Sequence, residues 1–221
     1  MTGRQQTTTN EEKPMADAAP AGGSGLIAIL RGITPDEVIA VGAALVEAGI
    51  HTIEVPLNSP DPYRSIERLA GRFGERIPIG AGTVLSVEEV ARARAAGAGV
   101  IVSPDTNTQV ITAALAAGMR PYPGVATPTE AFTAVRAGAR SLKMFPSDAL
   151  GISGMRAVRA VLPAEVELVP VGGVDESNLG DWLAAGAGGA GLGTSLYRPG
   201  DSADEVRIKA RRLSKIWAST R

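Results

Sequence analysis

Short apolar runs alternate with longer amphipathic stretches along most of this chain, from residue 25 onward. The apolar runs are brief and bounded by polar or Gly-containing turns, a pattern that predicts β-strands. Eight runs follow one another at intervals of roughly 20–26 residues, which leaves room for a helix and two short loops in each interval. The predicted strands cover residues 26–32, 51–57, 77–84, 99–104, 120–125, 140–146, 166–173 and 189–194.

The stretches between the strands carry the signals of helix starts and helix ends. Thr34, Ser86 and Thr127 each precede Pro or Glu residues, which is typical of an N-cap and a first turn. The helices end at Gly-containing segments such as "AGA", where Gly lets the chain turn towards the next strand. Apolar strands that alternate with amphipathic helices predict a parallel sheet covered by helices on its faces.

Eight strand–helix units favour an α/β fold of one specific kind, a single (β/α)₈ or TIM barrel, over an open doubly wound sheet. The glycine-rich "VGGV" does not match the GxGxxG dinucleotide fingerprint, which also argues against the open sheet. We expect residues 25–221 to form the barrel with short loops. Residues 1–24 are polar and then rich in Ala, Pro and Gly, so we expect a disordered tail, with Met15 as a second possible start.

Composition excludes several kinds of chemistry. The formal net charge is −1, so nucleic acid is not an expected partner. There is no Cys and only one His, which excludes thiol catalysis, Cys-ligated zinc and a multi-His metal site. That residue, His51, lies at the amino end of a predicted strand and is expected to be structural. No apolar run reaches the roughly 18 residues of a membrane span, so we expect a cytoplasmic protein without a membrane partner.

Lys143 is the most unusual polar residue of the chain, because it stands inside the apolar run "LKMF". The other lysines are Lys13, Lys209 and Lys215, in the tail and in the last predicted helix. An apolar environment disfavours the ammonium form, and a neutral amine can form a Schiff base with a carbonyl. The alternative is a structural lysine that reaches solvent or pairs with a carboxylate. Alternation predicts that Leu142 and Met144 face the helices, with Lys143 and Phe145 towards the barrel interior.

Arg31 and Glu54 are the other charged residues at predicted carboxyl ends of strands, where TIM barrels place their active sites. Glu54 alternates with Ile53 and Val55 and so points into the barrel, where a buried carboxylate suits general acid–base work. Arg31 offers a forked donor for a carboxylate or a phosphate. Each could instead form a structural ion pair.

Glycine-rich turns follow the last two predicted strands, in "PVGGV" and "GLGTS". Barrel enzymes often bind phosphate through backbone N–H groups at these two positions, although turns alone also need Gly. The coincidence of both turns predicts a phosphate site. Thr83, in the similar turn "GAGTV", could supply a hydroxyl to a substrate oxygen.

The motifs together resemble one known family. "LRGITPDE", "IEVPLNSP", "GAGTVL", "VSPDTN", "PGVATPTEAF", "LKMFPS", "VPVGGV" and "GLGTSLYRPG" are similar in order and spacing to those of the KDPG/KHG aldolases. The resemblance covers residues 25–218 and is greatest to the branch acting on 2-dehydro-3-deoxy-6-phosphogalactonate (KDPGal). In the phosphogluconate (KDPG) branch an arginine stands where this chain has Asn58, a departure that favours the galactonate branch and makes Asn58 a candidate substrate contact.

The resemblance implies a role for each candidate residue. Lys143 matches the Schiff-base lysine and Glu54 the catalytic acid–base. The candidate contacts to the pyruvyl part of the substrate are Arg31, Thr83, Pro104 and Phe145. The candidate phosphate site comprises Gly172, Gly173, Gly193, Thr194 and Ser195.

The resemblance also implies an activity. It is a class I aldolase, a homotrimer without metal or cofactor, that cleaves KDPGal to pyruvate and D-glyceraldehyde 3-phosphate. Three alternatives remain open. The aldolase could act on the gluconate epimer or on both epimers. The protein could instead be a phosphate-binding barrel isomerase or epimerase, or a non-catalytic sugar-phosphate binding protein.

Overall fold

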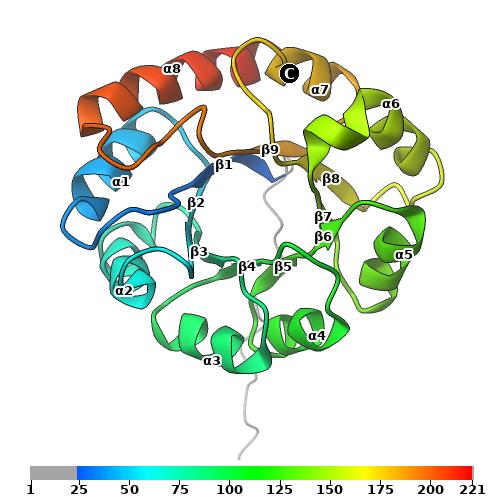
Figure 1. Cartoon of the computed structure of the whole chain (residues 1–221), viewed down its shortest axis with the longest axis horizontal. Helices are drawn as coiled ribbons and strands as arrows, with labels where there is room; N and C mark the ends of the chain where they lie inside the picture. Colours follow the sequence, from blue (N-terminus) through cyan, green and yellow to red (C-terminus); the bar gives the residue numbers. More distant parts are fainter. Residues whose placement is uncertain (1–23, 221) are drawn as a thin grey trace, which may run out of the picture.

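The computed structural model describes residues 24–220, which form a barrel of parallel strands ringed by helices (Figure 1). The strands are β1 (Gly25–Ile29), β2 (Thr52–Pro56), β3 (Ile79–Gly82), β4 (Val100–Val102), β5 (Arg120–Tyr122), β6 (Gly124–Val125), β7 (Ser141–Met144), β8 (Glu167–Pro170) and β9 (Gly189–Leu192). The helices are α1 (Val38–Glu47), α2 (Pro62–Phe73), α3 (Val87–Ala95), α4 (Thr108–Ala116), α5 (Pro128–Arg136), α6 (Ser147–Arg159), α7 (Leu179–Ala184) and α8 (Ala203–Ser219). The predicted tail lies outside the described residues, except for Ser24.

The strands pair in parallel in two arcs, β5-β4-β3-β2-β1-β9 and β6-β7-β8. A bridge between Val171 and Gly191 joins β8 to β9 and closes the barrel on one side. On the other side the N–H of Lys143 donates to the carbonyl of Pro123, between β5 and β6, at 2.9 Å. The predicted (β/α)₈ barrel is therefore confirmed.

Two local predictions differ from the structure. The run 120–125, predicted as one strand, is split into β5 and β6 around Pro123, which has no N–H to continue a ladder. Helix α1 begins at Val38, not after Thr34; residues 35–37 form a turn, over which the Thr34 hydroxyl donates to the carboxylate of Glu37. The caps predicted at Ser86 and Thr127 are confirmed as capping boxes.

Alternate residues of each strand build two apolar layers. Leu142 and Met144 belong to the layer between strands and helices, as predicted. The layer inside the barrel consists of Ile27, Ile29, Val100, Val102, Tyr122, Val169 and Val171. The middle of the interior is therefore a packed apolar core, which leaves polar side chains to the two ends of the barrel.

His51 lies at the amino end of the barrel. Its Nδ1 accepts a hydrogen bond from the N–H of Leu26 at 3.2 Å, and its ring centroid lies 5.4 Å from that of Trp217 in α8. These contacts fit the structural role predicted for it. Among residues 24–220, no helix combines the length and the apolar character that crossing a membrane would require.

Candidate active site

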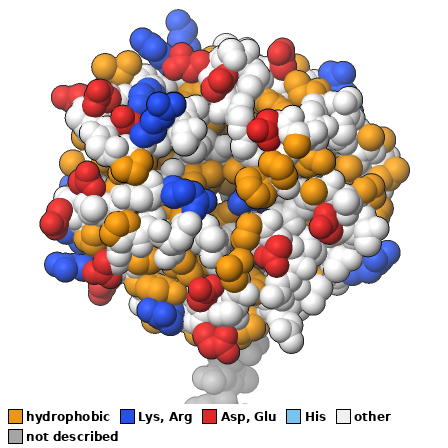
Figure 2. Space-filling view, viewed as in Figure 1, with side chains coloured by type: hydrophobic (Ala, Val, Ile, Leu, Met, Phe, Trp, Pro, Cys, Tyr) orange, Lys and Arg blue, Asp and Glu red, His pale blue; other side chains and the backbone are white. Residues whose placement is uncertain are grey.

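An open cavity of about 640 Å³ lies at the carboxyl ends of β1, β8 and β9. Viewed along the barrel axis, the centre of the face is hollowed and basic side chains gather there (Figure 2). The lining residues include Ile29, Arg31, Phe145, Val171, Gly172, Gly173, Asp175, Gly191, Gly193, Thr194, Ser195 and Arg198. The structure thus brings together two predicted sets, the glycine-rich turns and part of the predicted pyruvyl pocket.

A smaller space of about 10 Å³ lies deeper in the barrel and contains Lys143 and Glu54. Its other walls are apolar and comprise Ile27, Ile29, Val102, Tyr122, Val169, Val171 and Gly191. Ile29, Val171 and Gly191 line both spaces, so the two charged side chains lie directly below the open cavity. A reacting group in this position would be shielded from water but reachable from the mouth.

Lys143 occupies the third position of β7, where alternation turns its side chain inward, and it is only 7% exposed. Burial lowers the pKa of its amine, the carboxylate of Glu54 opposes that change, and the charge of Arg31 adds to it. The Nζ atom lies 4.6 Å from the centroid of the Phe145 ring. The site therefore favours the neutral, nucleophilic form of the amine more than water does.

Glu54, in β2, is 2% exposed. Burial raises the pKa of its carboxyl from 4.5 to about 7, against the opposing charges of Lys143 and Arg31. Its Oε2 has no hydrogen-bond partner among residues 24–220, and the ion pairs within 4.0 Å in that range do not include it. Such a group can exchange a proton near neutral pH, and the simple structural ion pair considered above is absent there.

Gly82, at the end of β3, sets the room available to the Glu54 carboxylate. A Cβ at residue 82 would lie 1.9 Å from Glu54 Oε2 and 2.5 Å from its Cδ, far inside van der Waals contact. Only Gly lets this backbone approach the carboxylate so closely. Sequence reasoning did not assign Gly82 to the site, since nothing in the string shows that β3 passes so close to Glu54.

Arg31 extends into a polar contact with two other predicted residues. Its guanidinium donates to the side-chain oxygen of Asn58 at 2.5 Å and to the hydroxyl of Thr83 at 3.5 Å. Thr83 has a φ of +56°, a left-handed conformation that is strained for a β-branched residue and typical of functional sites. The structure thus assembles Arg31, Asn58 and Thr83 at the mouth.

Pro104 follows β4 and lines neither space. Its carbonyl oxygen packs against Gly124, where an added Cβ would lie 2.2 Å from that oxygen. The substrate contact expected for Pro104 stays a prediction. Phe145, in contrast, lines the open cavity and is 38% exposed.

The glycine-rich turns that follow β8 and β9 form another part of the cavity wall. Gly172 and Gly173 have φ angles of +102° and +70°, conformations that favour Gly. Their carbonyls accept hydrogen bonds from Ser147 Oγ at 2.6 Å and Asn178 Nδ2 at 2.8 Å, which fix the turn.

The wall is also rich in free donors. Within the described part of the chain, the backbone N–H groups of Gly172, Gly173, Thr194 and Ser195 donate to no acceptor. The buried hydroxyl of Ser195 is likewise unpartnered there. Converging free N–H groups suit an anion.

Arg198 lines the same cavity and was missed by sequence reasoning. The available signal was its position in "GTSLYRPG", three residues beyond Ser195 in the loop that follows the last strand.

The described residues do not form a metal site. Residues 24–220 contain no group of three or more His, Asp or Glu side chains placed to hold an ion.

Comparison with known proteins gives concordant matches. The family model for KDPG and KHG aldolase matches residues 22–210. The 2-dehydro-3-deoxy-6-phosphogalactonate aldolase of Escherichia coli K12 is 46% identical over 192 residues, 87% of this chain and 94% of that protein. A probable 2-dehydro-3-deoxy-6-phosphogalactonate aldolase of Rhizobium meliloti is 51% identical over 84% of this chain and 87% of the relative. A solved structure described as native KDPGal superposes with a TM-score of 0.87 at 46% identity, covering 88% of this chain and 95% of that one.

Proposed function

The chain belongs to the KDPG and KHG aldolase family, and on that premise we propose that it is a class I aldolase that cleaves 2-dehydro-3-deoxy-6-phosphogalactonate to pyruvate and D-glyceraldehyde 3-phosphate. The observation that carries the proposal is a buried amine of lowered pKa, Lys143, in an apolar space that it shares with Glu54, a carboxyl whose pKa is raised to about 7. The relatives named for this substrate support the galactonate epimer.

In the proposed reaction the neutral amine of Lys143 attacks the C2 ketone of the substrate. The carbinolamine loses water and gives an iminium ion. Removal of the C4 hydroxyl proton lets the C3–C4 bond break, because the iminium accepts the electron pair as an enamine and the C4 oxygen becomes the carbonyl of glyceraldehyde 3-phosphate. Protonation at C3 and hydrolysis of the iminium release pyruvate and return the amine.

Glu54 is the proposed base for the C4 hydroxyl, acting through a water molecule, and the proposed acid in the protonation of C3. A pKa of about 7 suits both directions at neutral pH, because neither form is strongly disfavoured. Burial supplies this pKa, and Gly82 supplies the space for the carboxylate.

The remaining candidates bind the substrate in this proposal. Arg31 pairs with the carboxylate of the pyruvyl part, held in place by Asn58 and Thr83. Phe145 and Pro104 bound the pyruvyl pocket. The phosphate binds to the free N–H groups of Gly172, Gly173 and the 193–195 turn, with the Ser195 hydroxyl as a further donor.

Borohydride trapping tests the proposal directly. The protein is incubated with pyruvate, reduced, and weighed intact; one reduced pyruvyl adduct is expected, mapped to Lys143 by peptide sequencing. Absence of the adduct would contradict the Schiff-base reaction and leave an isomerase or epimerase, which needs no iminium. An adduct without cleavage of either epimeric phosphorylated sugar acid would indicate a binding protein.

Cleavage rates for the two C4 epimers test the choice of substrate. Pocket contacts that distinguish epimers are worth about 1–3 kcal/mol, or roughly 10- to 200-fold in kcat/KM. We expect the galactonate epimer to be preferred within this range. Equal rates would indicate a dual-specificity enzyme, and the opposite preference would indicate the gluconate substrate.

Two further parts of the proposal concern the protein as a whole. We propose that it works in the cytoplasm, as expected from its sequence, and that it assembles as a homotrimer, as the family resemblance implies. Light scattering after size exclusion should give about three times the chain mass of 22.6 kDa. A mass of one or two chains would contradict the trimer.

A further inference from the structure

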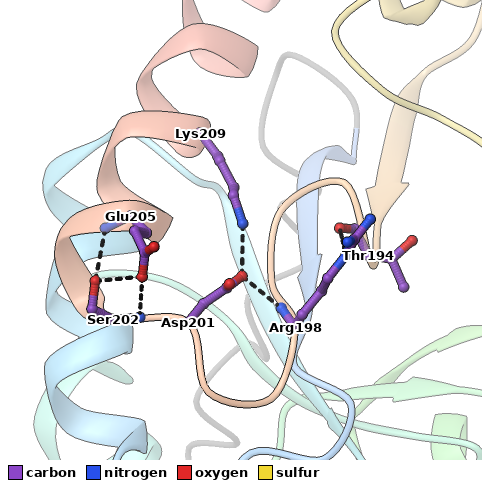
Figure 3. Close-up of polar contacts among 6 residues, drawn as sticks. All are labelled: Thr194, Arg198, Asp201, Ser202, Glu205 and Lys209. Atoms are coloured by element: carbon purple, nitrogen blue, oxygen red, sulfur yellow. Dashed lines mark hydrogen bonds and ion pairs between the residues drawn. The ribbon is translucent and has the colours of Figure 1, made fainter.

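Arg198 lies in the loop between β9 and α8, on the glycine-rich side of the open cavity. Its Nε donates to the carbonyl of Thr194 at 3.2 Å, so the side chain folds back along its own loop (Figure 3). The two terminal nitrogens of the guanidinium donate no hydrogen bond within residues 24–220, and the ion pairs in that range do not include Arg198. A tethered guanidinium with two free nitrogens beside free N–H groups is suited to an oxyanion.

The loop contains one carboxylate, that of Asp201, which already has hydrogen-bond partners. Its Oδ2 accepts from the backbone N–H of Arg198 at 2.9 Å and from Lys209 Nζ in α8 at 2.7 Å (Figure 3). The hydrogen bond from Lys209 is the main reason that the pKa of Asp201 is lowered. Asp201 therefore joins the backbone of the Arg198 loop to α8, and the Lys209 charge balances its carboxylate.

The other charged groups around the cavity also have partners. Asp175 accepts from the N–H of Ser177 at 2.8 Å and from its hydroxyl at 2.6 Å. Glu176 lies 3.8 Å from an Arg212 nitrogen. The second arginine of the lining is Arg31, which contacts Asn58 and Thr83. On the glycine-rich wall, the uncommitted positive charge is that of Arg198.

We propose that Arg198 is a substrate-binding residue that pairs with the phosphate group seated on the 172–173 and 193–195 turns, and that Asp201 and Lys209 are positioning residues that hold its loop for this contact. The inference rests on the proposed function, since it assigns a further contact within the same site. It adds a charged, side-chain contact to a cradle otherwise made of backbone N–H groups and one hydroxyl. Arg198 thus makes the enzyme selective for phosphorylated over unphosphorylated substrates.

Aldol addition of pyruvate to two acceptors measures this selectivity. Glyceraldehyde 3-phosphate and glyceraldehyde differ only in the phosphate, so the ratio of their kcat/KM values isolates that group. A charge-assisted contact of this kind predicts that Arg198→Gln lowers the ratio about 10- to 100-fold, with Arg198→Lys in between. Arg211→Gln, at an exposed arginine of α8, is the matched control and should leave the ratio unchanged. An unchanged ratio in Arg198→Gln would overturn the proposal.

A double-mutant cycle tests the positioning role of Lys209. Lys209→Met alone should raise the KM for glyceraldehyde 3-phosphate about 3- to 10-fold while borohydride trapping of pyruvate stays at the wild-type level. In an Arg198→Gln background it should have little further effect, because it acts through Arg198. A loss of equal size in both backgrounds would contradict this role.

Calorimetry keeps the inference separate from the proposed function. Glyceraldehyde 3-phosphate should bind the wild-type protein about 10- to 100-fold more tightly than Arg198→Gln, whether or not the enzyme cleaves a sugar acid. Failure of pyruvate trapping in the wild type would refute the aldolase proposal alone. Normal trapping with equal binding by both proteins would refute the Arg198 proposal alone.

Discussion

Glu54 and Glu167 lie at opposite ends of the same barrel and are held in opposite ways. Glu167 begins β8 at the amino end, and its Oε2 accepts from the hydroxyls of Ser24 at 2.5 Å and Ser141 at 3.1 Å. Glu54 lies towards the carboxyl end, is nearly inaccessible, and leaves Oε2 unpartnered among residues 24–220. The carboxylate at the amino end joins three segments of the barrel, whereas the one below the mouth is left free to exchange a proton.

The contrast separates the groups that stabilise the barrel from the groups that serve the proposed reaction. A buried carboxyl without a partner costs stability, and that cost appears as the raised pKa of Glu54. The amine of Lys143 is buried at the same end, and burial lowers its pKa. Substitutions at the mouth should therefore reduce activity without reducing stability, and substitutions at the amino end should do the reverse.

The largest expected effect follows from Lys143→Met. The substitution removes the proposed nucleophile, so kcat should fall by at least about 10⁴-fold and borohydride trapping should disappear. Thermal unfolding should be no easier than in the wild type, because Met has similar length and removes a buried amine. Lys215→Met, at an exposed lysine of α8, is the matched control and should stay active. Residual trapping in Lys143→Met would place the Schiff base on another amine.

Glu54→Gln should lower kcat about 10²- to 10⁴-fold, the range of general acid–base catalysis. Trapping of pyruvate should persist, since the amine of Lys143 remains. In the wild type, kcat/KM should fall as the pH drops below about 7, because the base is then protonated. Glu67→Gln, at an exposed residue of α2, should keep this pH profile. A normal rate in Glu54→Gln would assign the proton transfers to another group.

Glu54 should also make stability depend on pH. Between pH 4.5 and about 7 the unfolded chain releases this proton while the folded protein retains it, so stability falls as the pH rises. The full cost is on the order of 3 kcal/mol above this range. The test compares Lys143→Met with the double variant Lys143→Met/Glu54→Gln. Both proteins lack the amine that interacts with Glu54, so they differ only in the carboxyl group. The free energy of unfolding is measured for both variants at pH 4 and pH 8. Relative to Lys143→Met, the double variant should be more stable at pH 8 than at pH 4. An equal difference between the variants at both pH values would refute the burial cost.

Gly82→Ala tests the space around the Glu54 carboxylate. The added Cβ must displace that carboxylate, and a misplacement of this size should lower kcat about 10- to 100-fold. Gly71→Ala is the matched control, because a Cβ at this position in α2 meets nothing within 4 Å. The control should keep full activity and gain roughly 0.5–1 kcal/mol of stability from a better helix former. Full activity in Gly82→Ala would mean that Glu54 can work from a displaced position.

The sequence was sufficient to predict the barrel and its principal charged pair. Strand and helix periods repeat clearly, and alternation within "LKMF" correctly separated Leu142 and Met144 from Lys143. Lys143 was identifiable because few lysines occur in the chain and because this one interrupts an apolar run. Features that depend on the local pattern of residues can therefore be predicted from the sequence alone.

Two of the features missed depend on how the chain folds in three dimensions, and a third has a local cause. The clash that makes Gly82 necessary arises from the register of β2 and β3, in which Pro56 pairs with Gly82, and a string of residues does not contain that register. The contact of Arg198 with the cavity depends on how its loop folds back onto Thr194 and is joined to α8 through Asp201. The split of residues 120–125 has a local cause, Pro123, whose effect on the ladder was not anticipated.

Glu167→Gln is expected to have the smallest effect, and to lower stability where the substitutions near Lys143 lower activity. It weakens two hydrogen bonds to a carboxylate, and the free energy of unfolding should fall by about 1–2 kcal/mol, while kcat and pyruvate trapping stay at wild-type values. Glu165→Gln, at an exposed position two residues earlier, should change neither stability nor rate. If Glu167→Gln lowered kcat as much as Glu54→Gln does, the two ends of the barrel would be coupled. The division into an amino end that stabilises and a mouth that reacts would then have to be abandoned.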